Sequence, residues 1–115
     1  MNPAVFLSDF ADHVFHVHLK DVGVNFDGRT GVLGSHLPIG STKRAWNFRS
    51  LGHGNVNFEE IIRVLNEIQY SGPLSIEWED NGMERIRGLN EAAQFARRLN
   101  FEPSAIDFDA AIKTD

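Results

Sequence analysis

The chain has 115 residues, 42% of them hydrophobic, and a formal net charge of −5 at pH 7, which suits one small domain and disfavours the broad basic surface of a nucleic-acid-binding protein. It contains no cysteine, so disulfides and thiolate ligands are excluded and any metal site must use His, Asp, Glu and water. No apolar run approaches about 18 residues and no export signal is recognisable, so we expect a cytoplasmic protein without membrane contact.

The first half of the chain predicts a helix, a strand and a long loop. Asn2-Pro3 is a typical helix start, and the apolar spacing after it predicts a short helix ending near Ala11. A strand over about residues 13–20 follows. Residues 22–56 contain seven glycines and little sustained periodicity, so we expect a loop that closes over a ligand or holds a local hairpin, for which residues 22–39 are a candidate.

The second half predicts helix, strand and helix, the repeating unit of parallel α/β folds. Asn57 and Glu60 form a capping box for a helix that residues 71–73 (SGP) end, and its apolar face comprises Phe58, Ile61, Ile62, Leu65 and Ile68. A strand over residues 74–80 comes next, followed by an amphipathic helix reaching Leu99. Ser104 with Asp107 predicts a short terminal helix around residues 105–112.

Polar side chains alternate with apolar ones in the segment 16–21 (HVHLKD). Successive side chains of an extended segment point to opposite faces, so His16, His18 and Lys20 share one face. Burying two imidazoles and an ammonium group costs several kcal/mol unless they find partners. The alternation therefore indicates that something in the core requires these groups.

The second strand repeats this alternation, with Ser75, Glu77 and Glu79 on its polar face. Imidazoles on one strand and carboxylates on another can complete a metal site. The alternatives are that either strand is an exposed edge, that each strand histidine is merely hydrogen-bonded or solvent-facing, and that Glu79 is a solvated carboxylate or a salt-bridge partner.

Three motifs occur in order: residues 16–21 (HVHLKD), 50–56 (SLGHGNV) and 72–80 (GPLSIEWED). They resemble the xylose isomerase-like barrel superfamily, specifically its sugar phosphate isomerase/epimerase branch. There the seventh strand reads H-x-H-x-K-D, a G-x-G segment precedes the seventh helix, and the eighth strand reads G-P-x-x-x-E. The resemblance implies that residues 1–115 are a single partial α/β domain. It would be the C-terminal part, about the last two βα units, of a (β/α)8 TIM barrel, with parallel strands, flanking helices and a long loop after the first strand.

The resemblance also implies an activity and a site. Such proteins are sugar or sugar-phosphate isomerases or epimerases that use a divalent cation, here Mn, Mg, Co or Zn, and transfer protons through an enediolate. Their metal is held by a glutamate, an aspartate, a histidine and a second glutamate, of which the last two correspond to His18 and Glu77. Glu77 also inherits a catalytic acid/base role, while His16 and Lys20 are expected to contact the substrate or support a ligand. The other two ligands would come from earlier strands.

Further residues are weaker candidates. Arg49 and His53 lie where relatives often place a substrate-facing arginine, and we assign them to substrate binding, with an exposed arginine of no special role as the alternative. Asp21 should point away from the polar face and cap the loop or pair with a neighbouring strand end. Trp46 is a packing residue or a platform for a sugar ring. The G-x-G at residues 52–54 lacks the spacing of a nucleotide loop, so no phosphate cradle is predicted there.

Two other functions compete with this interpretation. Type IV apurinic endonucleases share the pattern at residues 50–55, but their D-R-H motif is missing from residues 44–49 (RAWNFR), and the acidic chain disfavours DNA. Alternatively, the chain is a non-catalytic α/β fragment that associates with itself. Two parallel strands cannot close a barrel, so we expect self-association or pairing with a missing N-terminal barrel portion, and an isolated chain that is inactive and binds cations weakly.

Overall fold

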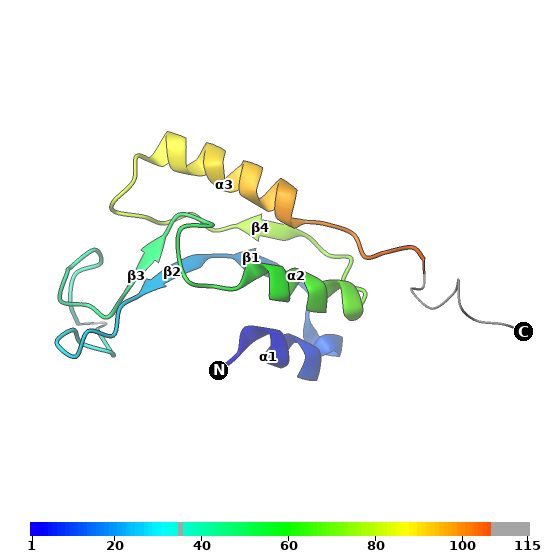
Figure 1. The fold of residues 1–115 in the computed structure, drawn as a ribbon, viewed down its shortest axis with the longest axis horizontal. Coiled ribbons are helices and arrows are strands. Elements are labelled where there is room, and N and C mark those ends of the chain that lie inside the picture. The colour runs from blue at the N-terminus through cyan, green and yellow to red at the C-terminus, as the bar shows by residue number, and fades with distance from the viewer. Residues whose placement is uncertain (35, 107–115) are drawn as a thin grey trace, which may run out of the picture.

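The chain folds into helices and short strands in the computed structural model, which describes residues 1–34 and 36–106 (Figure 1). The elements in chain order are α1 (Pro3–Asp9), the 3-10 turn η1 (Ala11–His13), β1 (Val17–Leu19), β2 (Asp21–Val24), β3 (Trp46–Arg49), α2 (Phe58–Glu67), β4 (Leu74–Ile76) and α3 (Arg85–Leu99).

The strands β1 and β4 pair in parallel, with Val17 opposite Leu74 and Leu19 opposite Ile76. Glu77 continues the ladder, since its N–H donates to the carbonyl of Leu19 at 3.0 Å. One face of this pair packs against α2 and α3 around the buried residues Leu19, Leu51, Phe58, Ile61, Ile62, Leu65 and Ala92. The two parallel strands with flanking helices confirm the predicted α/β class and are consistent with part of a barrel, and no closed barrel forms among the described residues.

The start of the chain differs from the prediction in its boundaries. The Asn2 side chain caps α1 by accepting the N–H of Ala4 at 2.9 Å, as predicted, but the helix ends at Asp9. The predicted strand over residues 13–20 is shorter, because η1 takes up its first residue and pairing extends only over Val17–Leu19. Apolar residues also occur shortly before Val17, but no strand among the described residues pairs with them.

The helix α2 confirms its prediction. The Asn57 side chain accepts the N–H of Glu60 at 3.2 Å and its amide donates to the Glu60 carboxylate at 3.4 Å. Phe58, Ile61 and Leu65 are buried on the face that meets the sheet. Its partner α3 begins at Arg85, where the Glu84 carboxylate accepts the N–H groups of the first turn.

The predicted loop over residues 22–56 contains an antiparallel hairpin. The strand β2 pairs with β3, with Asp21 opposite Arg49 and Val24 opposite Trp46. Residues 22–39 were the predicted hairpin candidate, and only the first strand lies there, because the partner strand begins at residue 46. The segment between the strands is held by buried Arg44, which donates to the carbonyls of Gly34 and Leu37 at 2.9 Å each.

Two predictions concern the ends of the described chain. Of the predicted terminal helix around residues 105–112, positions 107–112 lie outside the described residues, and residues 105–106 form a bend. No helix within residues 1–34 and 36–106 is long and apolar enough to span a membrane.

Candidate metal and substrate site

Three charged or ionisable side chains meet where β1 and β4 end. His18 Nδ1 lies 3.1 Å from Glu77 Oε2, and Lys20 Nζ lies 2.7 Å from Glu77 Oε1. Lys20 also reaches Glu79 Oε2 at 2.9 Å. We call His18, Lys20, Glu77 and Glu79 the polar cluster. They lie on the face of the β1–β4 pair opposite the hydrophobic core, as the strand alternation predicted.

The polar cluster forms because the two strands are parallel and in this register. His18 pairs with Ser75, and Glu77 lies two residues further on, on the same face. His16 joins the same row, since its Nε2 lies 2.7 Å from the Ser75 hydroxyl and its ring is 5.1 Å from that of His18. One face of the β1–β4 pair thus carries two imidazoles, an ammonium group and two carboxylates.

The cluster stabilises Glu77 in its charged form. The hydrogen bond from Lys20, and then that from His18, hold the pKa of the Glu77 carboxyl below its usual value. The same contact with Glu77 raises the pKa of Lys20, against the opposing effect of burial, and Glu79 raises it further. Lys20 Nζ also lies 4.0 Å from the centre of the Phe48 ring, a cation–π contact. A carboxylate and an ammonium group therefore face each other at neutral pH.

The cluster contains side chains of the types that ligate cations. Imidazole nitrogen and carboxylate oxygen suit a hard or borderline divalent cation, and the side chains of His18 and Glu77 are open to solvent at 58% and 47% of their area. Within the described parts of the chain, no group of three or more His, Asp or Glu side chains is arranged to hold a metal ion. The donors fit a divalent cation by type, and two of them leave most of its coordination shell to other ligands.

Arg49 and His53 lie elsewhere. They line a hollow of about 430 Å³ whose lining does not include His18, Lys20 or Glu77. His53 Nε2 lies 3.0 Å from the carboxylate of Glu91 on α3. The structure therefore groups the predicted substrate-binding residues into two sets, with His16 and Lys20 at the polar cluster and Arg49 with His53 beside the hairpin.

Asp21 has the structural role that its position predicts. It is buried, and its carboxylate accepts the backbone N–H groups of Val22, Gly52, Gly54 and Val56 at 2.9 to 3.2 Å. A side chain at Gly54 would collide with this carboxylate, and Gly52 has a φ of +91°. The G-x-G segment thus wraps an internal carboxylate, a contact that its glycine spacing alone does not reveal.

Trp46 and Trp78 are held by specific hydrogen bonds. The Trp46 indole donates to the Val32 carbonyl at 3.0 Å and lies under the Arg44 guanidinium at 3.9 Å. The Trp78 indole donates to the Ser50 hydroxyl at 2.8 Å and packs beside the hydrophobic core. Both contacts are those of packing residues.

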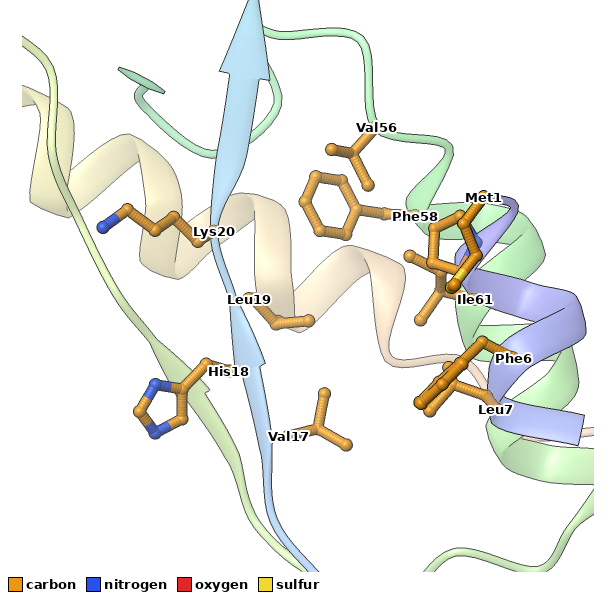
Figure 2. Close-up of a pocket in the computed structure, with 11 residues that line it drawn as sticks. Met1, Phe6, Leu7, Val17, His18, Leu19, Lys20, Val56, Phe58 and Ile61 are labelled. Atoms are coloured by element: carbon orange, nitrogen blue, oxygen red, sulfur yellow. The ribbon is translucent and has the colours of Figure 1, made fainter. Parts of the chain in front are cut away.

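An apolar hollow of about 420 Å³ lies between α1, β1 and α2 (Figure 2). Its apolar side includes Phe6, Leu7, Val17, Phe58 and Ile61. Figure 2 shows the His18 and Lys20 side chains directed away from these residues. The strand β1 thus separates an apolar hollow from the polar cluster.

Comparisons with known proteins agree with this architecture. A family model described as xylose isomerase-like TIM barrel matches residues 3–99. An inosose dehydratase of Clostridium botulinum is 34% identical over 80 residues, which are 70% of this chain and 26% of the relative. An inosose dehydratase of Clostridium beijerinckii is 31% identical over 80 residues, with the same coverage. The chain therefore spans about a quarter of the length of these relatives, and it belongs to the xylose isomerase-like TIM barrel family.

Proposed function

We propose that this chain is the C-terminal portion of a divalent-metal-dependent sugar or sugar-phosphate isomerase or epimerase, with His18 and Glu77 as two of the metal ligands. The observation that carries the proposal is the 3.1 Å contact between the His18 imidazole and the Glu77 carboxylate, on neighbouring parallel strands. Glu77 directly follows β4 and His18 precedes the last residue of β1, so both lie toward the carboxyl ends of the strands, the end of a TIM barrel where catalysis takes place.

The proposed reaction begins with removal of a proton from a carbon beside a carbonyl. The carbon–hydrogen bond breaks, the Glu77 carboxylate accepts the proton, and the electron pair forms the enediolate. A bound divalent cation would polarise the carbonyl and stabilise the enediolate oxygens. Return of the proton by Glu77 to the neighbouring carbon would complete an isomerisation. An epimerisation would instead need a second acid, supplied from the missing part of the barrel, to deliver a proton to the opposite face of the same carbon.

Lys20 has a supporting role in this proposal. Its ammonium group bridges Glu77 and Glu79 and keeps Glu77 charged, which a general base requires. Lys20 is the least exposed member of the polar cluster, with 24% of its side chain accessible. It is therefore suited to orienting Glu77 or a ligand oxygen.

Dehydration is a second candidate, favoured by the relatives named inosose dehydratase. An inosose is a cyclic polyhydroxy ketone, and its dehydration can start with the same proton removal. Loss of the hydroxyl group on the next carbon as water would then replace the return of the proton. The cluster supports the shared first step, and the choice between the two outcomes rests on the substrate.

The active form requires more strands than this chain provides. Two strands are present in the parallel sheet, whereas a TIM barrel has eight. We propose that an N-terminal barrel portion, or further copies of the chain, supplies the remaining ligands and packs against the apolar hollow beside β1. The exposed apolar side chains of Phe6, Phe10 and Phe15 support either form of association. A cytoplasmic location remains a prediction.

The test uses the chain within a completed barrel. His18→Ala and Glu77→Gln should each remove both the bound cation and turnover, because each deletes a ligand. His13→Ala and Glu67→Gln are matched controls, since both residues are exposed and outside the cluster, and they should retain both properties. Full metal content in both cluster variants would contradict the assignment.

A further inference from the structure

The hollow beside the hairpin differs in charge from the rest of the chain. Two arginines, Arg44 and Arg49, line it together with His53, and none of its lining residues among those described is Asp or Glu. The chain as a whole has 16 acidic and 11 basic residues. A hollow with this lining in an acidic protein is a local positive site. We call it the hairpin hollow.

Arg49 is the group in the hairpin hollow that has unused hydrogen-bonding capacity. A guanidinium has five N–H donors. Within the described chain, the Arg49 guanidinium makes one hydrogen bond, from Nη1 to the Phe48 carbonyl at 3.4 Å, and no ion pair. Arg44, by contrast, has three hydrogen bonds to backbone carbonyls and contributes mainly its charge.

Arg49 forms no ion pair with the buried carboxylate of Asp21. Asp21 lies opposite Arg49 in the β2–β3 ladder, but its oxygens accept four backbone N–H groups instead. The Arg49 side chain lies close over Gly23, where an added Cβ would approach the Arg49 Cγ and Nε to 3.1 Å. Among the described residues, the arginine therefore has no acidic partner.

Neutral donors complete the hollow. Asn25, Asn55 and Thr42 line it, and the Asn55 amide oxygen already accepts the N–H of Val24, which leaves its NH₂ group for a ligand. Asn47 lines it too, but its amide is occupied by the N–H of Gly40 and the carbonyl of Ser41. The ring of His53 lines the hollow as well, and its Nε2–H donates to the Glu91 carboxylate. Amide and hydroxyl donors around a guanidinium with unused N–H groups match the hydrogen-bonding needs of a phosphate or a carboxylate.

We propose that the hairpin hollow is an anion site in which Arg49 binds the oxygens of a phosphate or carboxylate group. The volume of about 430 Å³ accommodates such a group together with part of a sugar-sized molecule. None of the proposed metal ligands lines the hollow, so the anion site does not depend on a cation or on the proposed reaction.

Inorganic phosphate is the first probe. We expect titration of the full chain, followed by ¹H–¹⁵N NMR, to give saturable shifts of the Arg49 Nε–H and of the amides of Gly23, His53 and Asn55. Arg49→Met keeps the length of the side chain and should weaken phosphate binding by about tenfold or more. Arg49→Lys keeps the charge without the planar guanidinium, and its phosphate affinity should lie between those of the wild type and Arg49→Met. Arg98→Met, at an exposed position near the end of α3, is the matched control and should bind as the wild type does.

A sugar phosphate, compared with inorganic phosphate, distinguishes the sources of the anion. Tighter binding of the sugar phosphate than of inorganic phosphate, at the same residues, would assign the anion to a substrate-sized ligand. Equal binding of the two would assign it to a free oxyanion, and both results support the site. Non-saturable shifts in the wild type, or equal losses in Arg49→Met and Arg98→Met, would overturn it. None of these experiments measures cation binding or turnover. Their outcome therefore does not bear on the proposal that His18 and Glu77 are metal ligands.

Discussion

His18 Nδ1 lies 3.1 Å from Glu77 Oε2, although 59 residues separate the two along the chain. The parallel register of β1 and β4 produces this contact, because it places Glu77 one step past the end of the ladder on the face that His18 occupies. A slip of one residue in either strand would turn one partner toward the hydrophobic core. The contact therefore depends on the packing that fixes the register.

A substitution at Leu19 tests the packing that fixes the register. Its side chain is 1% exposed and lies between β1 and the helices, so Leu19→Ala should reduce the free energy of unfolding by about 2–5 kcal/mol. Urea denaturation measures this. Leu33→Ala, at a position that is 83% exposed, is the control and should change the value by less than about 0.5 kcal/mol. Equal costs for the two variants would show that Leu19 is not a core residue.

Asp21 is predicted to hold the G-x-G segment in place. Asp21→Asn replaces one acceptor oxygen with a donor, which leaves at least one buried N–H without a partner and should cost about 1–3 kcal/mol of stability. Faster hydrogen exchange at the amides of Gly52 and Gly54 would locate the loss. Asp12→Asn, at an exposed position of η1, should leave exchange there unchanged. Unchanged exchange in Asp21→Asn would contradict the capping role.

The Glu84 carboxyl group should make the stability of the protein depend on pH. The N–H groups of Arg87 and Ile86 hold the pKa of the Glu84 carboxyl below its ordinary value of 4.5. A carboxyl group whose pKa is lower in the folded than in the unfolded state stabilises the protein at pH values above its unfolded-state pKa. This stabilisation is lost as the pH falls through the folded-state pKa. The Tm of Glu84→Gln should therefore be lower than that of the wild type at neutral pH, and the difference should shrink below about pH 4.5. A difference that persists undiminished in acid would exclude this cause. Glu67→Gln is the control.

Lys20 should have a larger effect than His18 on the charge of Glu77. The hydrogen bond from Lys20 is the main cause of the lowered pKa of Glu77, and that from His18 is the second. Lys20→Met should therefore raise the Glu77 pKa toward its ordinary value by more than His18→Ala does. Carbon-13 NMR titration of the Glu77 carboxyl measures both shifts. The reverse order would mean that Lys20 does not make its contact with Glu77 in solution.

The sequence was sufficient for features that depend on local patterns. The Asn57–Glu60 capping pair and the apolar spacing after it predicted α2, and strict alternation predicted that His16, His18 and Lys20 share a face. These patterns are local because a helix repeats every 3.6 residues and a strand every two. The family motifs added the parallel pairing, which local patterns do not contain.

Contacts between distant segments were not predicted from the sequence. The strand β3 was missed because its partner β2 lies on the far side of residues 25–45, and no short turn links the two strands. The start of α3 was missed because Glu84, which caps it, is not among the residues typical of that position. The grouping of Arg49 with His53, away from the polar cluster, depends on this hairpin. It was not predicted because the hairpin was not.

Titration of the 115-residue chain with Mn²⁺, followed by NMR, tests the central claim most directly. Paramagnetic broadening detects weak binding, and two ligands in an open shell predict weak binding. We expect broadening to begin at His18 and Glu77 and to disappear from both in Glu77→Gln. Broadening that begins elsewhere in the chain, with these two residues unaffected at the same Mn²⁺ concentration, would contradict the claim that they share a cation.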